Sequence, residues 1–272
     1  MTMTLDAGVG RWQGTGLANQ IGILTGRSMR ALLGDPKLVI FSVLQPLIML
    51  LLFSQVFSGI AGTAGFPPGV SYIDYLMPAI LVTTGVGAAL QSGIGLVTDM
   101  KNGVLGRLRS LPINPSSVLV ARSLADLIRT ALQLLILLVA AVVLFGFSPA
   151  GGVLGVLPAF LLALAVSWSL SWVFLAIGTW LRNAETMQTV GFLAMFPLMF
   201  ASSAFVPVDG LPAWLRVIAQ INPLTYAVNA SRDLALAMPV GTGVLGALAT
   251  STGLLLVGFV AAVRGFRRPL AP

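Results

Sequence analysis

The chain has 272 residues, of which 57% are hydrophobic and only 8% are charged. Soluble domains carry about 25% charged residues, so this composition excludes an ordinary soluble fold and favours an integral membrane protein. Cysteine and histidine are both absent, which excludes disulfides, thiol nucleophiles and imidazole bases. The net charge of +7 is not gathered on a polar domain, so no nucleic-acid partner is expected.

Residues 1–35 are expected to form a cytoplasmic amphipathic segment, and residues 36–272 a single membrane domain. One helical face of the first segment carries four apolar residues, Leu17, Ile21, Leu24 and Leu32. Such a helix lies along a membrane surface, either as a simple basic anchor or also in contact with a cytoplasmic partner. Asp35 followed by Pro36 predicts a new helix start. No signal-peptide pattern precedes it, so the chain is expected to insert through its own first helix.

Six uncharged apolar runs are long enough, or extendable by a turn, to cross a hydrocarbon core as helices. They are Leu38–Phe57, Tyr75–Val97, Ala131–Phe147, Val153–Leu181, Met187–Val206 and Val244–Val263. The third is expected to begin earlier, near Leu124, with Arg129 reaching toward lipid headgroups. We therefore predict an all-α integral membrane protein with six transmembrane helices.

The basic residues predict the orientation of these helices. All but two of the 15 Lys and Arg residues lie before the first span, after the second, after the fourth, or after the sixth. The other loops hold only Arg216 and Arg232. Because Lys and Arg concentrate on the cytoplasmic side, both termini are predicted to be cytoplasmic, in a multi-pass protein of the cell membrane.

The loop after the second span reads as a short amphipathic helix. Val104, Leu105, Leu108 and Leu111 share one helical face, and Pro112 ends the helix. The loop is either a solvated positive-inside loop or a docking helix for a cytoplasmic protein.

The segment Phe205–Tyr226 is apolar, but Pro and Gly interrupt it repeatedly. The breaks disfavour a complete span, and the apolar character disfavours a free loop. Short re-entrant helices in the outer leaflet are expected, covered by neighbouring helices. Trp214 and Tyr226 suit the level of the lipid headgroups.

These segments carry a family resemblance. The run Phe196–Pro207, followed by Leu211–Leu215 and Asn222–Ala227, resembles the ABC type-2 exporter permeases. The loop Gly103–Pro115 with Val118–Arg122 is similar to the daunorubicin-resistance branch of that family. The resemblance implies a permease half that works with a second copy or a related permease, and with a separate ATPase docked beneath.

The resemblance also implies roles for particular residues. The inner loop would be the ATPase-coupling helix, with contacts from Gly103, Leu105, Arg107, Leu108, Arg109 and Leu111. The family often has Glu where Gly106 stands, so an acidic contact to the ATPase is either missing or supplied by Asp99. The outer segment is expected to act as a gate through Pro207, Trp214, Asn222, Pro223 and Tyr226.

The fifth span offers a candidate substrate path, because aromatic, thioether and hydroxyl groups together adapt to varied ligands. Its residues are Phe192, Met195, Phe196, Met199, Ser202 and Ser203. The alternative is that most of them simply pack against lipid or neighbouring helices.

Three smaller patterns concern packing. Gly85, Ala89 and Gly93 recur every fourth residue, and close packing within the subunit is expected rather than a dimer seam. Arg122, Asp126 and Arg129 share a helical face and are expected to form a structural ion pair at the cytoplasmic end rather than a substrate site. Glu185 is expected to stabilise the start of the fifth span through the helix dipole; a role in gating near the ATPase is the alternative.

No Gly-Lys-Ser/Thr phosphate loop is present, so ATP and Mg are expected on the partner ATPase. No cofactor, metal or catalytic residue is expected on this chain. The predicted function is export of hydrophobic or amphipathic compounds such as antibiotics or drugs. Export of a lipid, glycolipid or polysaccharide is an alternative, and a non-transporting membrane scaffold or sensor is another.

Overall fold

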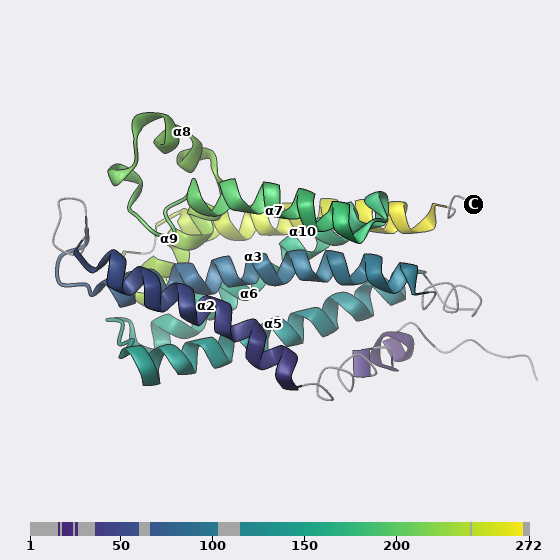
Figure 1. Ribbon diagram of the computed structural model, residues 1–272, viewed down its shortest axis with the longest axis horizontal. Helices are drawn as coiled ribbons and strands as arrows, with labels where there is room; N and C mark the ends of the chain where they lie inside the picture. Colours follow the sequence, from purple (N-terminus) through teal and green to yellow (C-terminus); the bar gives the residue numbers. More distant parts are fainter. Residues whose placement is uncertain are drawn as a thin grey trace, which may run out of the picture.

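A computed structural model describes residues 16, 18–23, 25–26, 36–59, 66–102, 115–239 and 241–268. Within these ranges the chain is helical and contains no strand. The elements, drawn in Figure 1, are α2 (Pro36–Val56), α3 (Tyr72–Lys101), α5 (Pro115–Phe145), α6 (Gly152–Leu181), α7 (Ala184–Phe200), the short 3-10 helix η2 (Val208–Gly210), α8 (Ala213–Ile221), α9 (Pro223–Ala235) and α10 (Gly243–Arg267).

Four helices, α3, α5, α6 and α10, are long and apolar enough to cross a membrane. The chain is therefore a multi-pass membrane protein. Helix α2 contains a shorter apolar stretch, Ile40–Val56, and α7 has 17 residues. Every predicted apolar run is helical in its main part, and α2 begins at Pro36, the residue at which a new helix was predicted.

Two predicted boundaries were wrong, both because polar groups have partners that the sequence does not reveal. Helix α5 begins at Pro115 rather than near Leu124, since its charged residues contact α3 or line a cavity and do not end the helix. Helix α7 ends at Phe200 rather than at Val206. Residues 201–206 bend away because side chains of other helices bind their carbonyl groups, as described below.

Helix α3 lies at the centre of the bundle and packs along α6. In its most apolar stretch 67% of the residues are buried, against 33% in α6, 28% in α5 and 17% in α10. Gly93 allows this approach, because a Cβ atom there would lie 2.7 Å from the carbonyl oxygen of Phe174. Gly85 faces Ser167 of α6 in the same way. The predicted packing of these small residues within the subunit is confirmed.

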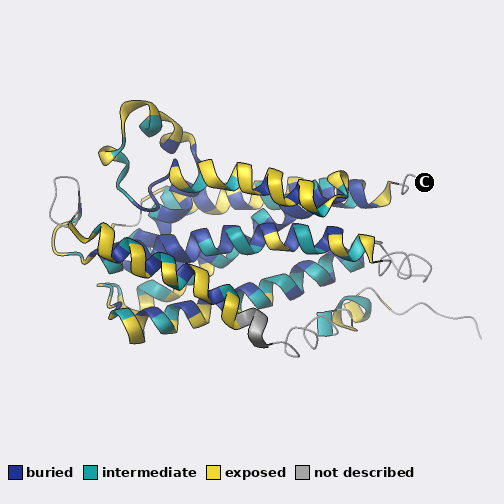
Figure 2. Ribbon diagram, viewed as in Figure 1, coloured by how far each residue is buried: buried dark blue, intermediate teal, exposed yellow. Residues whose placement is uncertain are grey.

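The outer helices expose large apolar side chains. Figure 2 shows exposed residues along α2 and α7, while α3 is mostly buried. Leu193 on α7 is 73% exposed and Val257 on α10 is 70% exposed. In lipid such surfaces are stable, since acyl chains are as apolar as the side chains.

The two ends of the bundle differ. The end of α3 at Lys101, the end of α10 and the described N-terminal residues lie toward one end, which we call the Lys101 end (Figure 1). Helix α8 lies at the opposite end, which we call the α8 end. Residues 18–23 are helical. Ser117 Oγ of α5 donates to Gln20 Oε1 at 3.1 Å, and Thr25 Oγ1 donates to the carbonyl of Ala121 at 3.3 Å.

Candidate functional site

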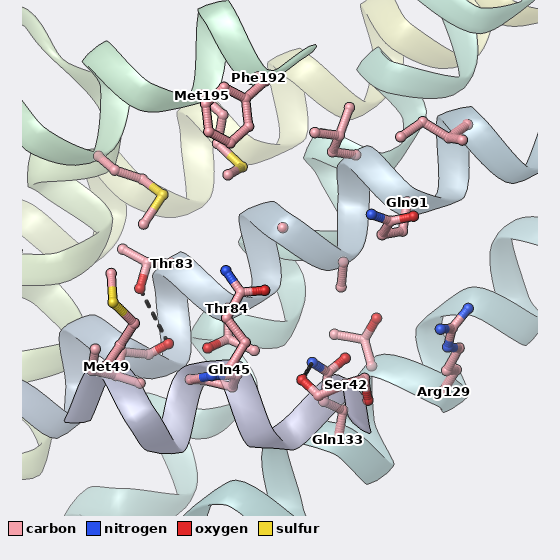
Figure 3. A pocket seen from close by; sticks show the side chains of 18 of the residues that line it. Ser42, Gln45, Met49, Thr83, Thr84, Gln91, Arg129, Gln133, Phe192 and Met195 are labelled. Carbon is pink, nitrogen blue, oxygen red and sulfur yellow. Dashed lines mark hydrogen bonds between the residues drawn. The ribbon is translucent and has the colours of Figure 1, made fainter. Parts of the chain in front are cut away.

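A cavity of about 520 Å³ opens between four helices. Its walls come from α2, α3, α5 and α7, together with Phe205 from the segment that follows α7. Figure 3 shows it from close by. These helices are far apart in the sequence, so only their packing brings the lining residues together.

One part of the cavity wall is polar. Amide and hydroxyl side chains come from all four helices, namely Ser42, Gln45, Thr83, Thr84, Gln91, Thr130, Gln133 and Gln188. Two of them are hydrogen-bonded to the backbone. Gln133 Nε2 donates to the carbonyl of Ser42 at 2.8 Å, and Thr83 Oγ1 donates to the carbonyl of Ala79 at 2.9 Å. Two charged residues of α5, Asp126 and Arg129, complete this wall. The wall can therefore hold a polar group by hydrogen bonds and charge.

The other part of the wall is apolar and comes largely from α7. Phe192, Met195 and Met199 line the cavity, as does Met49 of α2; Figure 3 shows Phe192 and Met195 on α7. Thioether side chains are unbranched and polarisable, so they adapt to irregular apolar ligands. The cavity is thus amphipathic, with a polar and an apolar region in the same space.

Three residues of the predicted substrate path lie elsewhere. Phe196 is 49% exposed and packs between Phe192 and Phe200, with ring centroids 5.4 and 4.6 Å away. Ser202 and Ser203 lie beyond the end of α7 and are each 2% exposed. Their hydroxyls donate to the carbonyl of Met199 and to Asn229 Oδ1, both at 2.6 Å. These two serines stabilise the chain itself and do not line the cavity.

The bent segment 201–206 is held by side chains of α3 and α9. Asn222 Nδ2 donates to the carbonyls of Leu198 and Ala201, both at 2.7 Å, while its Oδ1 accepts from the Leu224 amide at 2.9 Å. One side chain thus closes the end of α7 and caps the start of α9. Tyr72 of α3 donates to the carbonyl of Phe205 at 3.1 Å.

Arg232 of α9 is the central contact of this segment. Its side chain is buried, with only 4% exposed. It donates from Nη2 to the carbonyl of Ser203 at 2.9 Å and from Nε to that of Tyr75 at 3.0 Å, and it lies 3.6 Å from the Tyr75 ring centroid. Within the described residues no carboxylate lies at ion-pair distance from it. Non-helical backbone at membrane level requires such internal partners.

The residues of the predicted outer gate differ in burial. Trp214 is 68% exposed on α8, and Tyr226, at 45%, donates to the carbonyl of Gln220 at 2.7 Å. Asn222 is buried, whereas Pro223 is exposed and Pro207 precedes η2. The expectation that neighbouring helices cover this segment holds for α9 and is wrong for α8 within this chain.

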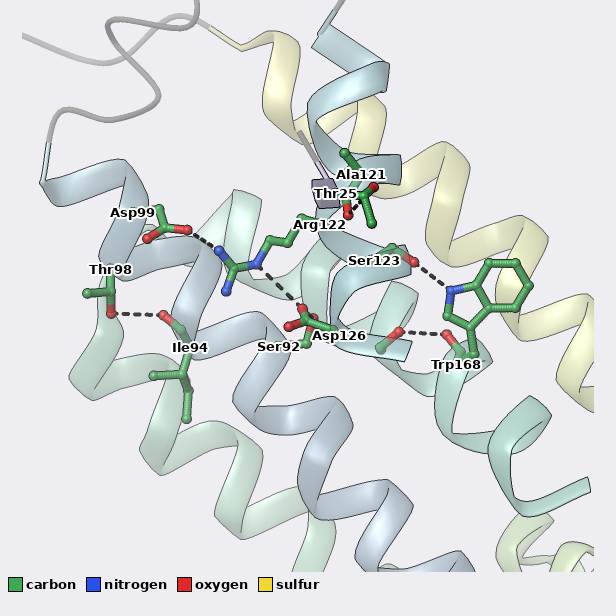
Figure 4. Close-up of polar contacts among 11 residues, drawn as sticks. Thr25, Ser92, Ile94, Thr98, Asp99, Ala121, Arg122, Ser123, Asp126 and Trp168 are labelled. Carbon is green, nitrogen blue, oxygen red and sulfur yellow. Dashed lines mark hydrogen bonds and ion pairs between the residues drawn. The ribbon is translucent and has the colours of Figure 1, made fainter. Parts of the chain in front are cut away.

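A polar network joins α3 to α5 near the Lys101 end (Figure 4). Arg122 pairs with Asp99, and its Nε lies 3.6 Å from Asp126 Oδ2. Ser92 Oγ of α3 donates to the same carboxylate of Asp126. Arg122 and Asp126 face each other as predicted, with Asp99 as an additional member, whereas Arg129 lines the cavity and is not part of this network. Glu185 lies in the first turn of α7, as predicted, and Asn183 Oδ1 caps that helix.

Some predictions concern residues that the structure does not describe. The predicted coupling residues Gly103 to Leu111 lie outside the described residues, as do Leu17, Leu24 and Leu32. Within the described ranges, no cluster of three or more His, Cys, Asp or Glu could hold a metal ion.

The sequence reasoning missed the polar cavity wall and the role of Arg232. A signal for the wall was present, because Gln45, Gln91 and Gln133 fall within or next to apolar runs, where an amide needs a partner. Arg232 was counted only as a loop residue. Its burial could not be predicted, because its partners lie on α3 and in segment 201–206.

The family model of ABC-2 type transporters matches residues 19–236, which include α2 to α9 and the whole cavity. The chain belongs to the ABC-2 type transporter family.

Named ABC transporter permeases are among its relatives. The chain is 33% identical over 208 residues to the daunorubicin resistance ABC transporter permease protein DrrB1 of Streptomyces coeruleorubidus, covering 76% of this chain and 72% of the relative. It is 27% identical over 233 residues to the probable doxorubicin resistance ABC transporter permease protein DrrC of Mycobacterium tuberculosis, covering 85% and 82%. It is 29% identical over 197 residues to the putative transport permease ycf38 of Porphyra purpurea, covering 72% and 67%.

Proposed function

We propose that the chain is the membrane permease subunit of an ATP-driven ABC exporter, which moves hydrophobic or amphipathic compounds such as drugs out of the cell. Membership of the ABC-2 type transporter family supports this proposal, as do relatives named for daunorubicin and doxorubicin resistance. The observation that carries it is the amphipathic cavity between α2, α3, α5 and α7.

The cavity has the properties of a small-molecule site. Its volume of about 520 Å³ falls within the range of about 300–1,000 Å³ that is usual for such sites. An apolar wall of methionine and phenylalanine would bind the body of an amphipathic compound, and the amides opposite would bind its polar part. In a membrane-spanning bundle, such a cavity suits a compound that passes between lipid and water.

We further propose six spans with both termini in the cytoplasm. Helix α2, with 21 residues, measures about 31 Å at 1.5 Å per residue, enough to cross a hydrocarbon core of about 30 Å. Helix α7 is shorter, and segment 201–206 would complete its crossing. The distribution of the basic residues supports a cytoplasmic Lys101 end. In intact cells an impermeant thiol reagent should modify Gly210→Cys but not Asn102→Cys, and the reverse pattern would reject this orientation.

The proposed partners are a separate ATPase, which binds ATP and Mg, and a second permease. The ATPase would dock at residues 103–111, between the ends of α3 and α5 that Arg122 ties together. If so, Leu105→Asp should abolish copurification of the ATPase while membrane insertion is retained. The second permease would cover the apolar side of the cavity, where the lining residues Phe41 and Phe192 are 68% and 56% exposed.

Filling the cavity tests the transport function directly. Gly87 lines the cavity, and a Cβ atom there would meet nothing within 4 Å. Gly87→Phe should therefore fold and occupy the space with its ring. Gly246→Phe on α10 is the matched control, because that glycine is equally unobstructed and does not line the cavity.

The readout is drug-stimulated ATP hydrolysis and drug export by the permease reconstituted with its ATPase. Gly87→Phe should remove most of the stimulation and export, while Gly246→Phe should retain both. If both variants transport normally, the cavity is not the transport path. If the wild-type complex shows no compound-stimulated hydrolysis, the chain is a scaffold or sensor and not an exporter subunit.

A further inference from the structure

Arg129 occupies an unusual position for a charged residue. It lies near the middle of α5, a 31-residue apolar helix, and it lines the cavity rather than an end of the bundle. A guanidinium is costly in hydrocarbon, so arginines in spanning helices usually face a cavity or a partner of opposite charge. The Arg129 side chain therefore faces the cavity. The cavity does not by itself supply a negative charge to pair with the guanidinium.

The carboxylate nearest to Arg129 in the sequence is already engaged. Asp126 accepts a hydrogen bond from Ser92 and faces Arg122 at 3.6 Å. In the described part of the chain, no carboxylate lies at ion-pair distance from Arg129. Among the described residues, Arg129 therefore has no acidic partner, whereas Asp126 on the same wall is paired with Arg122 and Ser92.

Amide groups line the same cavity as this charge. Gln91 of α3 and Gln188 of α7 line the same cavity, and Figure 3 shows Gln91 and Arg129 toward one side, with Met49 toward the other. Guanidinium and amide N–H groups are hydrogen-bond donors that match the oxygens of a carboxylate, phosphate or sulfate. A cationic group placed here would meet a like charge at low dielectric and would be disfavoured.

We propose that the cavity takes an amphiphile with an acidic headgroup, which binds Arg129 beside the amides of Gln91 and Gln188 while its apolar part lies against Phe192 and Met195. The role of this amphiphile as cargo rests on the proposed transport function. The binding itself does not, and it is testable on the permease alone.

The test compares two photoreactive probes with equal chains and opposite permanent charges. The purified full chain in phosphatidylcholine nanodiscs is labelled with diazirine-bearing hexadecyl sulfate or hexadecyltrimethylammonium. The measured quantity is a ratio: the labelling of cavity peptides from α5 and α7 divided by the labelling of the lipid-facing side of α10. This division corrects for partitioning of the probe into the bilayer. This ratio should be about tenfold higher for the sulfate, the usual size of a charge-assisted hydrogen-bond effect.

The variants assign this preference to one residue. Arg129→Gln should lower the sulfate ratio to that of the ammonium probe, and Arg129→Lys should keep most of it. Arg264→Gln is the control, because Arg264 is exposed at the end of α10 and lies outside the cavity. Equal ratios for the two probes in the wild type, or an unchanged sulfate ratio in Arg129→Gln, would overturn the proposal.

A further arm identifies the source of the acidic group. If phosphatidylglycerol added to the nanodiscs displaces the sulfate probe, the natural occupant is an anionic membrane lipid. If it does not, the occupant is a separate amphiphile; both results support recognition of an acidic headgroup. Selective sulfate labelling without any compound-stimulated ATP hydrolysis would reject the exporter proposal and leave this site standing.

Discussion

Helices α8 and α9 follow one another in the chain, separated by Asn222, yet they lie in opposite environments. Only Ala219 is buried in α8, and three of its apolar side chains, Trp214, Val217 and Ile221, are 57% or more exposed. In α9 eight residues are buried, among them Val228 and Arg232. The more apolar of the two helices is therefore the one that stays outside the bundle.

Polar contacts explain the difference. Arg232 and Asn222 bind carbonyls of α3, α7 and segment 201–206, so α9 is attached to three other parts of the chain. The one arginine of α8, Arg216, donates to the carbonyl of Asp209 at 2.7 Å, within its own segment. Because lipid solvates apolar side chains as well as protein does, polar contacts and close packing decide which helix lies inside.

The strongest test of this comparison removes the buried charge of α9. Arg232→Met keeps most of the side-chain volume but leaves the carbonyls of Tyr75 and Ser203 without their donor. We expect a loss of about 3–5 kcal/mol in the free energy of unfolding, since each buried unsatisfied group costs about 1–3 kcal/mol. Titration with sodium dodecyl sulfate in mixed micelles, followed by circular dichroism, measures it.

Arg216→Met on α8 is the matched control and should cost less than about 1 kcal/mol, because its contacts are local and exposed or only partly buried. Equal losses in the two variants would mean that α9 is not held by Arg232, and the contrast between the two helices would fail.

A smaller effect is expected at the junction of the two helices. Asn222→Ala removes the amide that donates to the carbonyls of Leu198 and Ala201, and it also removes the side-chain cap of α9. The free energy of unfolding should therefore fall by about 1–3 kcal/mol. Hydrogen exchange should also quicken in residues 198–206. Gln220→Ala, an exposed side chain of α8, should change neither quantity. Unchanged exchange in Asn222→Ala would show that the end of α7 does not depend on this residue.

The smallest effect is expected on α8 itself. Trp214 is 68% exposed, so Trp214→Ala should change the free energy of unfolding of the isolated chain by less than about 0.5 kcal/mol. A loss of several kcal/mol in the isolated chain would contradict the exposed position of α8. A loss found only in the assembled complex would instead place α8 in the interface with a second permease.

The sequence predicted part of the apolar wall of the candidate site, but neither its polar wall nor its geometry. Phe192, Met195 and Met199 were predicted as path residues from their chemistry, and they line the cavity. Ser202 and Ser203 were predicted by the same reasoning, but they lie past the end of α7 and bind the chain itself. A list of suitable side chains cannot separate these cases, because the position of a bend depends on donors from other helices.

The sequence by itself determined the membrane class, the helical runs, the start of α2 at Pro36 and the family, because each depends on composition, local period or a contiguous motif. Only the tertiary structure decided that α5 continues through its charged residues, that Arg232 lies inside and that α8 lies outside. It also decided that amides from α2, α3 and α5 share one cavity with Arg129. The physical reason is the same throughout: in lipid an apolar side chain has no strong preference for protein, so a helix is placed by its polar groups, and their partners lie on segments remote in the sequence.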